Sequence, residues 1–170
     1  VVGGGIAGIL CTYFLTQAGV DCLLLEAERL CGGTTQGTTA KITSQHGLIY
    51  SRLARTRGLE AARLYLETNQ AALARYKALC QGIDCDFAET DAFVYSRSHR
   101  EPLAAEVAVL KRLGFPAELT RDTSLPFPVA GAVRFPGQAR FHPLKFLAHI
   151  AKGLPIRENT KVLVLMTGAA

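Results

Sequence analysis

Three glycines near the start of the chain, Gly3, Gly5 and Gly8, constrain the fold more than any other feature. They follow the apolar pair Val1-Val2, which is typical of the end of a buried strand, and they precede a helical pattern. In this setting Gly3 permits a tight turn, Gly5 lets the backbone approach a pyrophosphate, and Gly8 allows close packing of helix on strand. The free N–H groups at the start of the helix would face the phosphates. The motif therefore predicts a dinucleotide-binding turn.

A βαβ unit is expected around this turn. The apolar spacing predicts a helix over 7–18, which Gly19 ends, and the hydrophobic run over 20–26 predicts a parallel second strand. Glu26 closes that strand, where a carboxylate can accept hydrogen bonds from ribose hydroxyls, and this favours FAD or NAD over NADP. The alternative is a glycine-rich turn with an unrelated surface glutamate.

A polar loop over 27–47 follows, too long for an ordinary connection between helix and strand. Its hydroxyl groups, together with the cation of Lys41, are suited to supplement pyrophosphate binding. The alternative is a solvated, flexible loop. The hydroxyl groups in question belong to Thr34, Thr35, Thr38 and Thr39.

The rest of the chain mixes helices and short strands. The fold class is α/β: an incomplete Rossmann-type FAD-binding domain (1–84 and 141–170) with an inserted α+β substrate-domain segment (85–140). The helices are expected over 48–56, 60–79, 101–113 and 143–152. The strands are expected as a short pair within 86–96, at 117–119, at 130–135 and 139–141 around a turn at Pro136-Gly137, and at 160–165.

Composition excludes several function classes. The net charge of +5 is spread along the 170 residues among acids, which disfavours a nucleic-acid surface. No apolar run approaches the roughly 20 residues of a membrane-spanning helix, so we expect a soluble protein. The five cysteines form no CxxC pair, which favours reduced thiols in a cytoplasmic protein and no metal site. No Ser, His and Asp arrangement supports hydrolysis.

Three stretches carry a resemblance to a known family. They are 1–26, the threonine-lysine stretch 32–47 and Arg140-Phe141-His142-Pro143-Leu144-Lys145. Together they resemble the glycine oxidase and D-amino-acid oxidase (DadA-like) flavoproteins, and most of all the bacterial branch in which a carboxy-terminal Rieske [2Fe-2S] domain follows. The threonine-lysine stretch is the more specific signal, because many NAD and FAD proteins share the glycine motif.

The resemblance implies bound FAD and oxidation of the C–N bond of an amine or amino acid by hydride transfer to the flavin. It places Glu26 on the ribose, Thr34, Thr35 and Lys41 near the pyrophosphate or flavin, and main-chain groups around Val162 near the adenine. The flavin carries the difficult chemistry in such enzymes, so no catalytic residue is assigned. The expected cofactor-binding residues are Gly3, Gly5, Ile6, Ala7, Gly8, Glu26, Ala27, Thr34, Thr35, Lys41 and Val162.

Two other readings stay open at this point. One is an NAD-dependent dehydrogenase, and the other is a non-catalytic flavin-binding fragment. The abrupt ends of the chain suggest a fragment, which we expect to be inactive and poorly soluble alone. Of the histidines, His46 is a candidate proton shuttle or a hydrogen-bonded loop residue, and His142 is expected to be a local cap.

Overall fold

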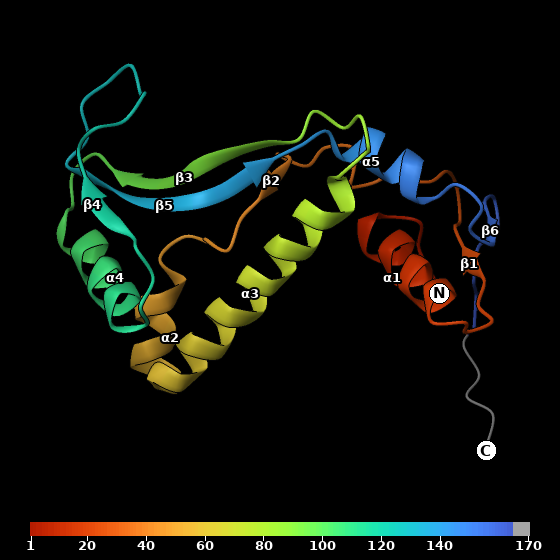
Figure 1. Ribbon diagram of the computed structural model, residues 1–170, viewed down its shortest axis with the longest axis horizontal. Helices are drawn as coiled ribbons and strands as arrows, with labels where there is room; N and C mark the ends of the chain where they lie inside the picture. The colour runs from red at the N-terminus through yellow and green to blue at the C-terminus, as the bar shows by residue number, and fades with distance from the viewer. Residues whose placement is uncertain (165–170) are drawn as a thin grey trace. The chain divides into compact units, whose positions relative to one another are not determined.

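The computed structural model describes residues 1–164, and its elements are labelled in Figure 1. The chain divides into two compact units. Unit 1 contains 1–40, 82–86 and the described residues from 141 onward, and unit 2 contains 41–81 and 87–140. No helix in this described part of the chain combines the length and the apolar character needed to cross a membrane.

Unit 1 is built on parallel strand pairing. Leu24 pairs with Ile156 in parallel register, and Val2 forms a parallel bridge with Leu25 on the other side. Helices α1 and α5 pack together, and Ile9 and Leu24 are fully buried. The elements are α1 (Ile6–Gln17), β1 (Leu24–Leu25), α5 (Pro143–Ile150) and β6 (Ile156–Arg157).

The sequence predicts a final strand at 160–165, but the structure has a strand at β6 instead. Parallel pairing instead occurs at β6, because the N–H of Leu24 donates to Pro155 O at 2.9 Å and the N–H of Glu26 donates to Arg157 O at 2.9 Å. Residues 160–164 belong to no strand, and Leu165 lies outside the described residues. The apolar run at 160–165 has the composition of a strand, but the position of the strand is set by the hydrogen bonds with β1.

Unit 2 contains an antiparallel sheet centred on β5. Strand β3 pairs along the whole of one edge of β5, while β4 and β2 pair with different parts of β5. Since β3 fills one edge, β4 and β2 share the other. The strands are β2 (Lys41–Ile42), β3 (Ala88–Ser96), β4 (Glu118–Thr120) and β5 (Gly131–Arg140).

Three helices pack on one face of this sheet and form the core of unit 2. Figure 1 shows α2 (Ile49–Arg57), α3 (Leu59–Cys80) and α4 (Glu101–Arg112) on the same side of β3 and β5. Phe135 of β5 is fully buried and stacks on Tyr50 of α2, with ring centroids 5.8 Å apart. The other buried members of this core are Ala62, Leu66, Leu103, Val107, Leu110, Leu113, Ala117 and Val133.

A bulge explains why two strand expectations were wrong. The sequence predicted a break at Pro136-Gly137 and a strand pair within 86–96, but β5 and β3 each run unbroken. Two residues of β5, Pro136 and Gly137, lie opposite Asp91 of β3, and Gly137 has a φ of 68°. This bulge absorbs the residues that would otherwise end the strand.

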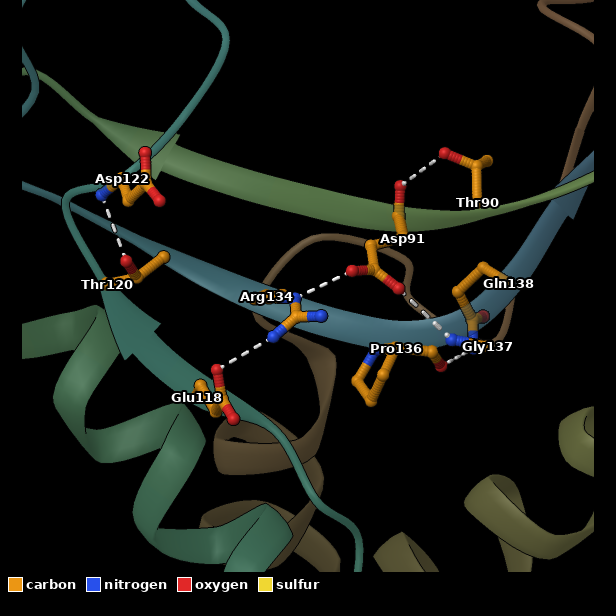
Figure 2. Close-up of polar contacts among 9 residues, drawn as sticks. All are labelled: Thr90, Asp91, Glu118, Thr120, Asp122, Arg134, Pro136, Gly137 and Gln138. Atoms are coloured by element: carbon orange, nitrogen blue, oxygen red, sulfur yellow. Dashed lines mark hydrogen bonds and ion pairs between the residues drawn. The ribbon is translucent and has the colours of Figure 1, made fainter.

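Charged side chains tie the bulge to the neighbouring strands, as Figure 2 shows. Asp91 Oδ1 accepts the N–H of Gly137 at 3.3 Å, and its Oδ2 accepts Arg134 Nε at 2.6 Å. Arg134 Nη1 also donates to Glu118 Oε2 at 3.0 Å. Arg134 therefore joins β3, β5 and β4 from one position on the central strand.

The unit boundaries differ from the expected domain boundaries. The sequence assigned residues up to 84 to the cofactor domain, whereas 41–81 belong to unit 2 with 87–140. The physical reason is that the apolar faces of α2 and α3 bury against the sheet through Tyr50, Ala62 and Leu66. The roles of the two units as FAD-binding and substrate domains stay predictions.

Candidate functional site

The glycine turn of unit 1 leads into the start of α1, as the motif predicted. The residues before it were predicted to end a buried strand, but Val2 is 56% exposed and forms a single parallel bridge with Leu25. The N–H of Leu25 donates to Val1 O at 3.0 Å, and the N–H of Gly3 donates to Leu25 O at 2.9 Å. Gly3 has a φ of 96°, a region that side-chain-bearing residues rarely adopt. The chain then enters α1 at Ile6, after Gly5. The end of the strand thus directs the backbone into the helix within three residues.

Gly8 brings the helix onto the strand at a distance that no other residue allows. A Cβ at Gly8 would lie 1.9 Å from Gly3 O, and a Cβ at Gly5 would lie 3.1 Å from Thr35 Oγ1. The first clash is with backbone, so it cannot be relieved by moving a side chain. The predicted role of Gly8 in close helix–strand packing is therefore what the geometry requires.

The carboxylate of Glu26 folds back over the turn. Its Oε2 accepts the N–H of Gly4 at 2.6 Å, and its Oε1 accepts the N–H of Glu28 at 2.8 Å. The hydrogen bond from Glu28, and then that from Gly4, hold the pKa of Glu26 below its usual value. A carboxylate offers about four lone-pair positions, so this ionised group keeps capacity to accept from a hydroxyl donor.

Thr35 reaches the first turn of α1 from the polar loop. It is 8% exposed, and its Oγ1 accepts the N–H of Ile6 at 3.1 Å. The loop is also held by the N–H of Cys31, which donates to Gly4 O at 2.9 Å. Because Thr35 Oγ1 accepts this bond, its own hydroxyl hydrogen is free to be donated to an anion at the helix start.

Other N–H groups at the start of α1 have no acceptor. Within residues 1–164, no hydrogen bond takes the N–H of Gly5 or of Ala7. No side chain caps the helix from Gly5, since glycine has none. Unpaired N–H groups at a helix N-terminus are the usual donors to a phosphate. The turn therefore has donors available where the motif places the pyrophosphate.

The remaining predicted residues lie in less defined positions. Ala27 is exposed and follows Glu26, and its N–H adds to the lowering of the pKa of Glu26. Thr34 is exposed in the loop, and Val162 is half-buried outside any strand. Lys41 lies in β2 of unit 2, opposite Arg140. The structure brings Thr35 and Glu26 to the glycine turn, and the contacts of the other four stay predictions.

Sequence reasoning missed Gly4, the middle residue of the turn. It is buried, it binds Glu26 through its N–H, and a Cβ there would lie 2.5 Å from Leu30 Cδ2. The run of three consecutive glycines was the available signal. The motif treats this position as free, so only the path of the following loop shows that it is constrained.

Buried polar side chains in unit 2 were also missed. Gln138 Oε1 accepts the N–H of Ser44 at 2.7 Å and Thr43 Oγ1 at 3.0 Å. Next to them, Gln45 is 6% exposed, and neither atom of its side-chain amide has a hydrogen-bond partner within the described residues. Nothing in the local sequence distinguishes these residues from an exposed polar loop, because their burial depends on β5.

Two histidines have defined local roles. His46 Nδ1 lies 2.8 Å from the hydroxyl oxygen of Tyr65, and the two rings meet edge to face. His46 is thus a hydrogen-bonded residue of the loop, which is one of its two expected roles. His142 Nδ1 accepts the N–H of Lys145 at 3.3 Å at the start of α5. The expected cap is thus confirmed.

The residues of unit 1 fit an extended dinucleotide. Gly5, Ala7 and Thr35 offer hydrogen-bond donors at the helix start, and the missing Cβ atoms of the glycines leave the approach open. The ionised Glu26 stands at the end of the neighbouring strand. Donors for phosphate and an acceptor for ribose are thus arranged on one turn.

Comparison with known proteins gives a family match over nearly the whole chain. The family model described as "DAO: FAD dependent oxidoreductase" matches residues 1–169. A Bacillus subtilis (strain 168) protein, YhfW, named as a Rieske 2Fe-2S iron-sulfur protein, is 37% identical over 177 residues. That match covers 99% of this chain and 35% of YhfW, so the chain spans about a third of this relative's length.

Solved structures share the fold of the chain. Glycine oxidase from Geobacillus kaustophilus matches with a TM-score of 0.72 at 20% identity, over 95% of this chain and 46% of that one. L-proline dehydrogenase from P. horikoshii matches with a TM-score of 0.74 at 17% identity, over 97% of this chain and 44% of that one. At such identities the likeness establishes the fold alone.

Proposed function

The chain belongs to the DAO family of FAD-dependent oxidoreductases, and from that premise we propose that unit 1 binds FAD within a larger enzyme that oxidises the C–N bond of an amine or amino acid. The observation that carries the proposal is the glycine turn. Gly8 packs against Gly3 O, the N–H groups of Gly5 and Ala7 are unpaired within the described residues, and Glu26 is ionised beside them.

Each residue of the turn has a defined part in holding the dinucleotide. Gly5 and Ala7 would donate their N–H groups to the pyrophosphate, and Thr35 would donate its hydroxyl hydrogen. Glu26 would accept from the ribose hydroxyls while keeping its bonds to Gly4 and Glu28. These main-chain bonds fix the carboxylate before any ligand arrives, so little ordering is needed on binding.

When bound, FAD supplies the ring that accepts a hydride from the carbon next to the substrate nitrogen. The contribution of this chain is then to orient the cofactor and to present unit 2 as part of the substrate domain. We propose that the electrons pass on either to oxygen or to a Rieske [2Fe-2S] domain elsewhere in the protein. The name of YhfW supports the iron–sulfur alternative.

The structural relatives suggest which substrates to test first. They include a glycine oxidase, an L-proline dehydrogenase and an L-amino acid deaminase. We propose an amino acid or a secondary amine of similar size as the substrate. NAD-dependent dehydrogenation is the competing reading of the same glycine turn, because both cofactors contain an adenosine diphosphate part.

The test is the visible absorption spectrum of the purified complete protein, taken before and after anaerobic addition of glycine, L-proline or D-alanine. We expect flavin bands that bleach with one of these compounds. Bands that no amine bleaches would contradict the proposed reaction and leave the cofactor assignment standing. A colourless protein that binds NAD would overturn the flavin assignment itself.

A further inference from the structure

A groove of about 550 Å³ lies between α2 and α4 on the helical side of unit 2. Its α2 wall includes Leu48, Arg52 and Arg55, which recur at the spacing of one helix face. Its α4 wall follows Pro102, Ala105, Val109 and Arg112, again one face over about three turns. At 1.5 Å per residue this second wall is about 15 Å long. The groove is therefore elongated along two helices.

The apolar part of the lining, called the floor below, consists of Leu48, Ala54, Pro102, Ala105 and Val109. Ala54 and Ala105 leave the hollow between the helices, and Leu48 and Val109 line it while staying only half-buried. An apolar strip of this kind, running between two helices, is the usual seat of an amphipathic helix that lays its apolar face into a groove.

The rim of the groove is positively charged and not neutralised. Arg52 and Arg55 stand on the α2 side and Arg112 on the α4 side. All three are exposed, and among residues 1–164 none of them forms a hydrogen bond or an ion pair through its side chain. Helix α2 also contains no acidic residue. The charge around this apolar floor therefore calls for carboxylates on the ligand.

We propose that the groove between α2 and α4 binds an acidic amphipathic helix of a partner protein. Arg52 and Arg55 are one turn apart, so their guanidinium groups match carboxylates one turn apart on another helix. Leucine-type side chains of the partner would fill the space above Ala54 and Ala105. A nucleic acid fits less well, because its solvated phosphates would lie against an apolar floor.

The two parts of the surface contribute differently to binding. Exposed ion pairs add little to affinity, so the arginines mainly set specificity and association rate. The apolar floor must supply the rest by excluding water. A correct ligand therefore needs both a hydrophobic stripe and flanking acids, which gives the experiment two independent handles.

The probe is a fluorescein-labelled helical peptide of about 18 residues, long enough to span the groove, with leucines at i, i+3, i+4 and i+7 and glutamates flanking them. Its control is a peptide of the same composition in scrambled order. Binding to the complete flavin-containing protein is followed by fluorescence anisotropy. We expect the striped peptide to bind at least about tenfold more tightly than the scrambled one, and to weaken as salt rises from about 50 to 500 mM.

Variants of the groove test the site itself. The pair Arg52→Glu/Arg55→Glu should weaken binding by about tenfold or more, and Ala105→Gln, which fills the hollow, by a few fold. Arg57→Glu on the same helix does not line the groove and should change binding less than about twofold. Circular dichroism and the flavin spectrum check that each variant is folded.

Three results would overturn the proposal. These are equal binding of the scrambled peptide, no effect of the arginine pair, or no binding of the striped peptide at all. A single-stranded oligonucleotide of equal charge that binds as tightly and responds to the same variants would also overturn it, in favour of a nucleic-acid surface. Because the assay reads peptide binding, its failure leaves the proposed C–N oxidation untouched.

Discussion

At Gly8, any side chain would place its Cβ 1.9 Å from the carbonyl oxygen of Gly3. The Cβ would clash with a backbone atom, so only a shift of α1 away from the strand could relieve the clash. Such a shift would also move the unpaired N–H groups of Gly5 and Ala7. One hydrogen atom in place of a methyl group therefore decides both the packing of the turn and its binding geometry.

We expect Gly8→Ala to lower the free energy of unfolding by about 3 kcal/mol or more and to abolish flavin binding. The measurements are a urea denaturation curve and the ratio of flavin to protein absorbance. Gly33→Ala, in the adjacent loop, is the matched control, because a Cβ there meets nothing within 4 Å. A Gly8→Ala protein that retained its full flavin content would contradict the assigned role of this turn.

The pH dependence of stability should report Glu26. Its pKa in the folded state is lowered by the N–H groups of Glu28 and Gly4. A lowered folded-state pKa gives stability that is fully present above the unfolded value of about 4.3 and is lost as the pH falls through the folded value. The wild-type protein should therefore lose part of its stability in the acid range below about pH 4.3.

Glu26→Gln removes the ionisable group and should flatten this part of the pH profile. Urea denaturation at several pH values between about 5 and 3 measures the slope. The control is Glu28→Gln, since the Glu28 side chain takes part in no hydrogen bond or ion pair within the described residues. Equal slopes for the wild-type and Glu26→Gln proteins would show that the carboxylate is not held as described.

The helices agree with their sequence expectations to within a few residues, and so does β4, whereas most of the other strands do not. A helix is specified by apolar spacing and by local breakers such as Gly19 and Gly58, which the sequence displays directly. A strand depends on its partner. Pro136-Gly137 has the composition of a turn, yet Asp91 on β3 accommodates it as a bulge. Such information is distributed over distant parts of the chain.

The candidate site likewise contains residues that the sequence predicts and residues that only the structure reveals. Gly3, Gly5, Gly8 and Glu26 follow from a motif with fixed spacing, and the family prediction is confirmed by the family match. The hydrogen bond from Ile6 to Thr35 shows that Thr35 of the loop lies at the helix start, and the part of the threonines in cofactor binding stays a prediction. The burial of Gln138 was not predictable, because it depends on a contact with a remote segment, and the run of three glycines was the only signal for Gly4.

The start of helix α2 is capped from another helix. Glu106 of α4 is fully buried, and its carboxylate accepts the N–H of Tyr50 at 2.9 Å and that of Ser51 at 2.6 Å. Leu48, the residue before α2, provides no side-chain cap. A carboxylate at a helix N-terminus also interacts favourably with the helix dipole. Glu106 thus joins α2 to α4 and completes the hydrogen bonds of the first turn.

Removing this cap should cost more than removing an ordinary surface glutamate. We expect Glu106→Ala to lower the free energy of unfolding by about 3 kcal/mol, because it leaves two N–H groups without partners and opens a cavity. Glu106→Gln keeps one acceptor and should cost less. Glu101→Ala, at an exposed position of the same helix, should cost under about 1 kcal/mol. Equal effects of Glu106→Ala and Glu101→Ala in thermal or urea unfolding would contradict the cap.

At the scale of the whole molecule, the two units are interleaved in sequence. Unit 2 consists of two long segments, 41–81 and 87–140, that interrupt the sequence of unit 1. We call these segments the two excursions. While unit 2 is folded, β2 pairs with β5 and Lys41 lies opposite Arg140, so the two ends of unit 2 are held together. When unit 2 unfolds, each excursion becomes a flexible loop whose closure costs about 3 kcal/mol. The stability of unit 1 should therefore depend on the core of unit 2, without any assumption about contacts between them.

Phe135→Ala tests this dependence. The side chain is fully buried between Tyr50 and Phe115, so its loss should destabilise unit 2 by about 3–5 kcal/mol. We expect flavin release and loss of secondary structure to shift to lower urea concentration together. Phe93→Ala, at a 43% exposed position on the sheet, is the control and should shift neither curve by much. A shifted structural transition with an unchanged flavin transition would contradict the coupling.

Residues 82–86 return to unit 1 between the two excursions. There Cys85 O accepts the N–H of His142 at 2.6 Å, and Asp86 pairs with Lys145 at 2.9 Å. If residues 41–140 were exchanged between two relatives as one block, this short strip would travel with them, while His142 and Lys145 stayed behind. A viable chimera should therefore combine the donor's 41–81 and 87–140 with the recipient's own 82–86. The five residues 82–86, which lie in the middle of the chain, therefore decide where segments of unit 2 can be exchanged.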